Sequence, residues 1–137
     1  MRVALVAGET SGDLLGAGLI RSRKQSCPNI EFEGVAGPQM QAAGCQVLEK
    51  SDVLAVMGLI EPLIEIPKLL KLRRRLITRW KHTKPDVVVG IDSPEFNLGL
   101  EAALRSTGIR TVHYVSPSIW AWRKGRVKNV EKAADRV

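Results

Sequence analysis

One short segment of the sequence brings together two carboxylates and an amide, Gly90-Ile91-Asp92-Ser93-Pro94-Glu95-Phe96-Asn97. Asp92 directly follows an apolar run, and partial desolvation at the end of a buried strand would make its carboxylate a stronger base. Glu95 and Asn97 lie further along, where they could bind hydroxyls. Alternatively, Asp92 or Ser93 only caps a helix whose first residue is Pro94. Capping accounts for one such residue but less well for all three, so the segment is a candidate catalytic site.

A glycine-rich segment follows the first apolar run of the chain, Gly8-Glu9-Thr10-Ser11-Gly12-Asp13. Its glycines allow a sharp backbone turn, and the N-terminus of a following helix can hold an anion. The spacing is not G-x-G-x-x-G, so the dinucleotide-binding pattern is missing. Glu9 would repel a pyrophosphate and is better suited to a sugar hydroxyl. The alternative, a capped turn in which Glu9 and Asp13 interact with the helix dipole, stays open.

Two of the three tryptophans lie in a third segment, Tyr114-Val115-Ser116-Pro117-Ser118-Ile119-Trp120-Ala121-Trp122-Arg123. Aromatic faces can stack on sugar rings, and the Arg123 guanidinium could bind a phosphate through two hydrogen bonds. Tryptophans that only pack in a core are the alternative. His113, inside the apolar run before this segment, is expected to be a core residue with a satisfied hydrogen bond rather than a catalyst.

Apolar runs alternate with amphipathic stretches along the chain, which predicts strands that alternate with helices. The predicted strands are 3–7, 30–35, 46–48, 86–91 and 111–115, and the predicted helices are 14–24, 38–44, 67–82, 96–105 and 122–134. Thr10 or Ser11 would cap the first helix, and Gly44 would end the second. This order predicts an α/β fold with a doubly wound, mostly parallel, Rossmann-like sheet. Ligands bind beyond the carboxyl ends of such strands, so the three polar segments should meet there.

The predicted helix 67–82 is both strongly basic and unusually apolar. Its apolar residues and those just before it cover roughly half of the helix circumference, whereas a helix that packs only on a sheet needs a stripe of about 100°. The remainder is cationic, with Lys68, Lys71, Arg74, Arg75 and Arg79. A cationic face beside an exposed apolar one is typical of binding to an anionic bilayer surface. We therefore expect contact with a bilayer at Ile60, Leu63, Ile66, Leu69 and Leu70.

Two further expectations concern this region of the chain. Pro67 disfavours helix at the residue before it, so residues 59–66 are predicted to form a separate turn or short helix. The alternative to membrane binding is a core helix with a solvated basic face. Nucleic-acid binding is disfavoured, because only Trp80 is interleaved with the basic run.

The 137 residues have room for one domain, and the net charge of +7 is concentrated in residues 68–84 and 123–132. The sequence has neither an export signal nor a run of about 18 apolar residues, which predicts a cytosolic or peripheral protein. Cys27 and Cys45 form no metal-binding pattern and are expected to be reduced structural thiols. The chain ends at Asp135-Arg136-Val137, where the pattern would begin another strand, so we expect a fragment of a larger protein.

Five motifs in the same order give the chain a resemblance to a known family. They are Ala4-Leu5-Val6-Ala7-Gly8-Glu9-Thr10-Ser11-Gly12-Asp13, Gly34-Val35-Ala36-Gly37-Pro38, Ala55-Val56-Met57-Gly58, the segment from Lys84-Pro85-Asp86 to Asn97, and the segment from His113 to Arg123. From Val3 to Val137 the chain resembles the lipid-A-disaccharide synthases. A single motif would be weak support, whereas so many long matches in one order are highly specific.

The resemblance implies an inverting glycosyltransferase of the GT-B type that needs no metal ion or cofactor, since the UDP-sugar is a substrate. It would transfer 2,3-diacylglucosamine from UDP to 2,3-diacylglucosamine 1-phosphate, giving lipid A disaccharide 1-phosphate and UDP. Residues 1–137 would form the N-terminal domain, which binds the acceptor at the cytoplasmic face of the inner membrane of a Gram-negative bacterium. The UDP-binding domain would lie outside this chain, which alone is expected to be inactive.

The resemblance also implies roles for single residues. Asp92 would be the base, with Glu9 as a second catalytic residue. The predicted substrate-binding residues are Gly8, Ser11, Gly12, Asp13, Glu95, Asn97, Ser116, Trp120 and Arg123. Two alternatives stay open: another GT-B enzyme that uses a UDP-sugar, such as an epimerase or a soluble glycosyltransferase, or a non-catalytic lipid-binding module. The partners would be lipid-linked acyl glucosamines and the anionic inner-membrane surface, with no nucleic acid and an open oligomeric state.

Overall fold

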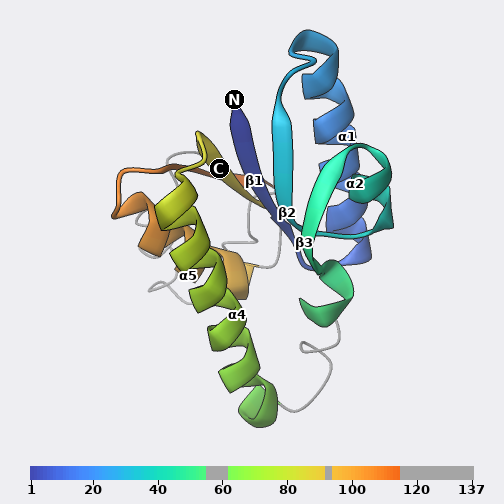
Figure 1. Cartoon of the computed structure of the whole chain (residues 1–137). Coiled ribbons are helices and arrows are strands. Elements are labelled where there is room, and N and C mark those ends of the chain that lie inside the picture. The colour runs from blue at the N-terminus through green and yellow to red at the C-terminus, as the bar shows by residue number, and fades with distance from the viewer. Residues whose placement is uncertain (55–61, 92–93, 115–137) are drawn as a thin grey trace, which may run out of the picture.

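The computed structural model has a five-stranded sheet at its centre, and all of its strands run parallel (Figure 1). The structure describes residues 1–54, 62–91 and 94–114, except for the side chains of residues 62–66, 94 and 95. The strands are β1 (Arg2–Ala7), β2 (Glu31–Ala36), β3 (Cys45–Lys50), β4 (Val87–Ile91) and β5 (Arg110–Tyr114), in the spatial order β3-β2-β1-β4-β5. The predicted parallel, Rossmann-like α/β sheet is confirmed.

In the described part of the chain, the helices between these strands are α1 (Thr10–Ser26), α2 (Pro38–Ala42), α4 (Pro62–Thr83) and α5 (Pro94–Arg105). Three of them begin with proline, whose missing N–H has no intrahelical partner at that position anyway. Gly44 and Gly108 follow α2 and α5 with φ angles of +111° and +90°, a conformation that favours glycine. Residues 51–54 add a helical turn after β3. The predicted helix 122–134 lies outside the described residues.

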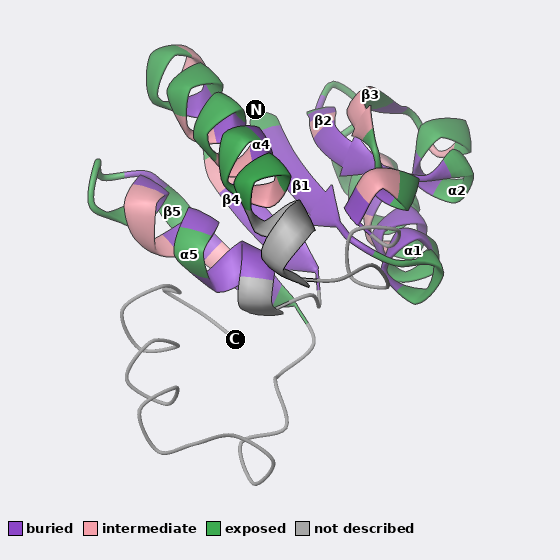
Figure 2. Cartoon of the chain, turned by 90° about the horizontal axis from the view of Figure 1, so that it is seen from below, coloured by how far each residue is buried: buried purple, intermediate pink, exposed green. Residues whose placement is uncertain are grey.

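Each face of the sheet carries its own core, because alternate side chains of a strand point to opposite faces. In β1, Val3, Leu5 and Ala7 pack on the side of α1 and α2, whereas Ala4 and Val6 pack on the side of α4 and α5. Figure 1 shows α1 and α2 on one side of the sheet and α4 on the other. Buried residues run along the central strands and the helix surfaces that meet them (Figure 2). Cover on both faces explains the continuous apolar sequence of β4.

The helix after residue 61 differs from the prediction. We predicted a separate turn over residues 59–66 and a helix from Pro67, but α4 begins at Pro62 and runs through Pro67 without a break. Pro67 is the sixth residue of this helix, so the N–H that it lacks would have met a carbonyl in the first turn. The loss of one hydrogen bond there is tolerated because a long amphipathic segment follows and packs on the sheet. Residues 55–61 lie outside the described residues.

Candidate active site

The last residues of three neighbouring strands lie side by side. Ala7 of β1 pairs with Ile91 of β4, and Ile91 pairs in turn with Tyr114 of β5. The three polar segments therefore leave the sheet from adjacent points on its carboxyl edge, as the predicted topology required. Asp92 and all residues from 115 onward lie outside the described residues, so the roles predicted for them stay predictions, namely those of Asp92, Ser116, Trp120 and Arg123.

The glycine-rich segment after β1 forms the N-terminus of α1. Glu9 is the N-cap residue, with extended backbone angles (φ −145°, ψ 166°), and its carbonyl oxygen accepts a hydrogen bond from the N–H of Asp13 at 2.9 Å. The prediction that Thr10 or Ser11 caps this helix is wrong, because the helix already begins at Thr10 and Glu9 precedes it. The side chains of Glu9 and Ser11 are exposed at this edge, while Gly8 is buried.

Gly12 brings the first turn of α1 against the ends of two strands. A Cβ at this position would lie 3.5 Å from Ala7 Cβ and 3.6 Å from Ile91 Cγ2. Gly12 is itself buried, so its place in the structure is a packing contact between helix and sheet. This contact fixes where Glu9 and Ser11 stand relative to the strand ends.

Asp13 was predicted to bind substrate, but its carboxylate is already engaged within the protein. The residue is 2% exposed, and its oxygens accept hydrogen bonds from the backbone N–H groups of Gly37, Gln39 and Met40 at 3.0, 2.9 and 2.9 Å. These N–H groups belong to the start of α2, so Asp13 caps a helix that follows one strand later. A Cβ on Gly37 would lie 2.5 Å from Asp13 Cγ, which explains the glycine. Asp13 thus has a structural role that joins α1 to α2, and its predicted contact with substrate stays a prediction.

The amide of the second polar segment is also buried. Asn97 has no exposed surface, and its Nδ2 donates hydrogen bonds to the carbonyl oxygens of Val6 and Ile91, both at 3.4 Å. The side chain therefore ties α5 to the carboxyl ends of β1 and β4. The burial of this amide gives Asn97 a structural role, and its predicted contact with a hydroxyl stays a prediction. The side chain of Glu95 lies outside the description.

Sequence reasoning missed a carboxylate beneath this edge, Glu101 of α5. Its Oε1 lies 3.0 Å from Nδ1 of His113 in β5, and neither side chain is exposed. Burial raises the pKa of Glu101, although hydrogen bonds from His113 and from the backbone of Gly90 act in the opposite direction. His113 is thus a core residue with a hydrogen-bond partner, as predicted. Glu101 could have been noticed, because it follows Asn97 by one turn on the otherwise apolar face of α5.

A hollow that we did not predict lies at the carboxyl ends of β2 and β3. Its volume is ≈ 640 Å³, and its polar lining includes Lys50, Ser51 and Asp52 together with the backbone at Gly37. The motif from Gly34 to Pro38 marks this position in the sequence, although it suggested no particular role. The candidate site can therefore extend along the carboxyl edge beyond the three predicted segments.

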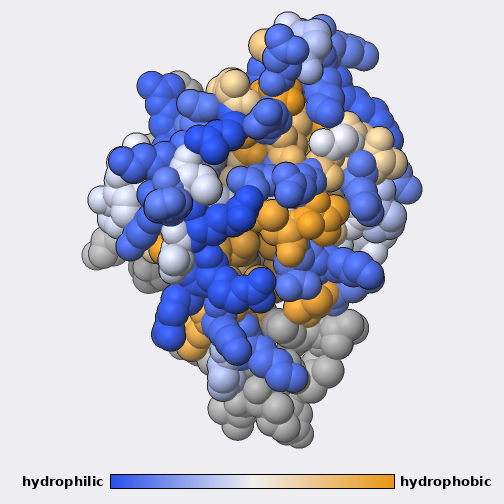
Figure 3. All heavy atoms as spheres, viewed as in Figure 1, coloured by the Kyte–Doolittle hydropathy of each residue, from blue (hydrophilic) through white to orange (hydrophobic). Residues whose placement is uncertain are grey.

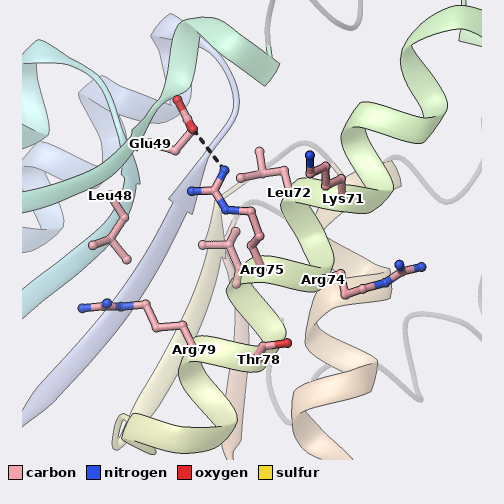
Figure 4. A pocket seen from close by; sticks show the side chains of 9 residues that line it. Leu48, Glu49, Lys71, Leu72, Arg74, Arg75, Thr78 and Arg79 are labelled. Carbon is pink, nitrogen blue, oxygen red and sulfur yellow. Dashed lines mark ion pairs between the residues drawn. The ribbon is translucent and has the colours of Figure 1, made fainter.

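A groove with a volume of ≈ 740 Å³ lies between β3 and α4. Its apolar lining comes from Leu48, Leu72 and Leu76, and an apolar area surrounded by hydrophilic residues is visible on this side of the molecule (Figure 3). Figure 4 shows Arg75 and Arg79 extending from α4 towards the sheet, whereas Arg74 points away from β3. The groove combines an apolar floor with a strongly cationic helix.

Two of these cations have acidic partners on the sheet. Arg79 Nη2 lies 2.7 Å from Glu33 Oε2, and Arg75 Nη1 lies 3.9 Å from Glu49 Oε2. Both arginines are largely exposed, so these pairs contribute little to stability. The five cations predicted for this face, Lys68, Lys71, Arg74, Arg75 and Arg79, are all exposed. Cations therefore outnumber carboxylates along this part of α4.

The predicted lipid-contact residues differ in how far they are exposed. Leu70 is 45% exposed, whereas Leu69 is half-buried and packs against the core under α4. From Leu69 to Trp80, the helix is a core helix with an exposed cationic face, which was the alternative to membrane contact. Ile60 and the side chains of Leu63 and Ile66 lie outside the description. In the part of the chain that the structure describes, no helix is long and apolar enough to cross a membrane.

The two cysteines are free thiols, as predicted. Cys27 is exposed and Cys45 is buried, and burial raises the pKa of the Cys45 thiol to about 12. A buried thiol with so high a pKa is a packing residue. Within residues 1–54, 62–91 and 94–114, no three His, Cys, Asp or Glu side chains gather in a way that could hold a metal ion.

Comparison with known proteins finds similarity along almost the whole chain. The sequence profile of the family described as lipid-A-disaccharide synthetase matches residues 3–137. Curated proteins named lipid-A-disaccharide synthase align with all 137 residues, at 55% identity in Alkalilimnicola ehrlichii and 56% in both Yersinia pestis and Escherichia coli O17:K52:H18. The chain spans 36%, 35% and 36% of the length of these three relatives. The chain therefore belongs to the lipid-A-disaccharide synthase family.

Proposed function

We propose that this chain is the acceptor-binding part of an inverting GT-B glycosyltransferase. The full-length protein would transfer 2,3-diacylglucosamine from UDP to 2,3-diacylglucosamine 1-phosphate, and would release UDP. The observation that carries the proposal is the register of Ala7, Ile91 and Tyr114, which brings three motif-bearing segments to one edge of the sheet. Because the chain spans about a third of its relatives, we assign UDP binding to the part of the relatives that it does not match.

In the proposed reaction, Asp92 accepts the proton of the acceptor's 6-hydroxyl as that oxygen attacks the anomeric carbon of the donor. The bond to UDP breaks on the opposite side of the sugar, so the anomeric configuration inverts. The exposed carboxylate of Glu9 and the hydroxyl of Ser11 orient the acceptor. Arg123 meets a phosphate, and Trp120 stacks on a sugar ring. In this step the carboxylate of Asp92 takes up the proton, and UDP leaves with the electrons of the broken bond; the proposal uses no metal ion or cofactor.

We further propose that the protein works as a peripheral enzyme at the cytoplasmic face of the inner membrane, where its acylated substrates reside. Support comes from the exposed cations of α4 and from Leu70, which stands exposed beside them. A cationic surface attracts anionic lipid headgroups, and an exposed leucine adds apolar contact with the bilayer.

The full-length protein, incubated with the two lipid substrates, tests this function. UDP release and the lipid product are measured together, and the linkage of the product is determined by NMR. We expect UDP and an inverted disaccharide in equal amounts. UDP release from other UDP-sugars without disaccharide would favour a different GT-B enzyme. Vesicle binding by the full-length protein with no UDP release from any UDP-sugar would favour a non-catalytic lipid-binding module.

A further inference from the structure

A buried carboxyl–imidazole pair lies directly below the carboxyl edge of the sheet. Glu101 Oε1 and His113 Nδ1 are 3.0 Å apart, and both side chains are 0% exposed. Glu101 belongs to α5 and His113 to β5, so this hydrogen bond joins a helix to the edge strand of the sheet. Both groups are excluded from solvent, so they do not contact a ligand at the surface.

The backbone at Gly90 makes room for this pair. Gly90 is the penultimate residue of β4 and pairs in register with His113. A Cβ on Gly90 would overlap Glu101 Oε1 and would lie 2.9 Å from the Cβ of Asn97. Glu101 therefore occupies the space that a side chain on β4 would otherwise fill. The carboxylate sits against the backbone two residues before position 92.

The pair cannot be explained by stability alone. Transfer of a carboxylate and an imidazole into a core costs free energy, and apolar residues of similar size often give an equal or more stable protein. In the described part of the chain, Glu101 Oε2 and His113 Nε2 have no hydrogen-bond partner, which adds to that cost. A directional hydrogen bond offers what apolar packing does not, namely a fixed distance between α5 and β5 under Gly90.

We propose that Glu101 and His113 are positioning residues of the acceptor site, which fix the end of β4 through the hydrogen bond beneath Gly90. Residue 92 follows this strand end directly, so an error in the position of Gly90 and Ile91 is passed on to the base. The inference rests on the proposed function, in which Asp92 accepts a proton. A misplacement of about 1 Å at a reacting group can cost on the order of 100-fold in rate.

Two replacements of Glu101 separate positioning from stability. Glu101→Gln keeps an oxygen that can accept the hydrogen bond from His113, whereas Glu101→Met has a similar size and no acceptor. In the full-length protein, we expect Glu101→Gln to keep kcat within about threefold of the wild type, and Glu101→Met to lower kcat about 10- to 100-fold with little change in KM. Thermal unfolding should show that both variants are folded at the assay temperature, with Glu101→Met the less stable of the two, because it leaves Nδ1 of His113 buried without a partner.

His113 provides the reciprocal test. The amide nitrogen of an asparagine can take the place of Nδ1, whereas the amide of a glutamine reaches the place of Nε2. We expect His113→Asn to keep kcat within about threefold and His113→Gln to lower it about 10-fold or more. Leu100→Val is the control, because Leu100 is a fully buried neighbour on α5 that makes no polar contact. It should lower the temperature of thermal unfolding by a few degrees and leave kcat unchanged.

Several results would overturn the inference. Equal kcat in Glu101→Met and Glu101→Gln would do so, as would a loss of kcat in Leu100→Val as large as that in Glu101→Met. Full kcat in His113→Gln together with a loss of kcat in His113→Asn would assign the role to Nε2, which takes no part in the hydrogen bond to Glu101. Asp92→Asn, assayed in parallel, keeps the two proposals apart. Near-normal kcat in Asp92→Asn would contradict the role of Asp92 as the base. If Asp92→Asn is inactive and Glu101→Met is fully active, only the positioning role of Glu101 and His113 is contradicted.

Discussion

Buried polar side chains hold together the backbone from which the candidate site begins. Asp13, Asn97 and Glu101 each bind backbone or side chains from another element, and none of the three is appreciably exposed. Their partners belong to the start of α2, to the ends of β1 and β4, and to β5. Glu9 and Ser11 are exposed, and in the proposed function they meet the acceptor. At the scale of residues, the edge is therefore built from two layers, a buried polar support and an exposed contact surface.

The support provided by Asp13 can be measured as stability. Asp13→Ala would leave the N–H groups of Gly37 and Met40 buried without a partner. We expect the free energy of unfolding to fall by about 3 kcal/mol, since each hydrogen bond to a charged group contributes about 1.5–3 kcal/mol. Urea denaturation measures this change. Glu31→Ala, at an exposed position, is the control and should change stability by less than about 0.5 kcal/mol. A loss for Asp13→Ala no larger than for the control contradicts the cap.

The raised pKa of Glu101 predicts a pH dependence of stability. Because burial raises this pKa above its usual 4.5, the folded protein holds the proton more tightly than the unfolded chain does. The resulting stability is present below the unfolded pKa and is lost as pH rises through the folded pKa. Glutamine does not titrate, so the wild type should lose stability relative to Glu101→Gln as pH rises above about 4.5. Urea denaturation of both proteins across this pH range is the measurement, and a constant difference would argue against the shift.

At the scale of elements, α4 combines two surfaces that the sequence alone did not separate. Leu72, Leu76 and Trp80 are buried against the sheet, whereas Leu70 stands exposed among the cations. Most of the apolar residues that suggested a second, exposed apolar surface thus pack in the core under α4. In the described part of this helix, only Leu70 and the cationic face remain available for contact with a membrane.

Leu70→Ser tests that contribution. We expect binding of the chain to vesicles with anionic headgroups to weaken about tenfold, since burial of a leucine in an apolar environment contributes about 1.5–3 kcal/mol and only part of it is inserted. Co-sedimentation with the vesicles is the measurement. Leu14→Ser on α1 is the matched control, because Leu14 is 61% exposed on the other side of the sheet. Equal binding by the wild type and Leu70→Ser would return α4 to a purely structural role.

At the scale of the whole molecule, the position of the positive charge matters more than its sum. The net charge is +7. Substitutions can remove the same number of positive charges from either side of the sheet. Lys71→Gln with Arg74→Gln removes two exposed charges from α4, and Arg21→Gln with Arg23→Gln removes two exposed charges from α1. We expect only the first pair to weaken binding to anionic vesicles, by about 30-fold at about 1 kcal/mol per charge. Equal weakening by both pairs would mean that net charge alone drives binding.

The fold could be predicted from the sequence wherever local and global preferences agree. The apolar, β-branched run of β4 and the glycines after α2 and α5 each have one favoured structure, and the parallel sheet with polar segments at its carboxyl edge followed from the alternation of strands and helices. The prediction at Pro67 was wrong because proline disfavours helix at the residue before it only as a local preference. The long amphipathic segment after Pro67 packs on the sheet and outweighs that preference. Asp13 and Glu101 could not be assigned because their partners lie 24 and 12 residues away in the sequence. Only the folded chain brings those groups together.

In the proposed function, the carboxyl edge of the sheet carries the chemistry, and Asp92 in particular is the base. Two aspartates flank β4, Asp86 at its amino end and Asp92 at its carboxyl end, and Asp86 accepts a hydrogen bond from the N–H of Arg2 at 2.7 Å. Single-turnover assays of the full-length protein compare Asp92→Asn with Asp86→Asn. We expect the rate of Asp92→Asn to fall about 100- to 10,000-fold, as for loss of a general base, and that of Asp86→Asn to change little. Near-normal turnover by Asp92→Asn, or an equal loss in both variants, would contradict this account.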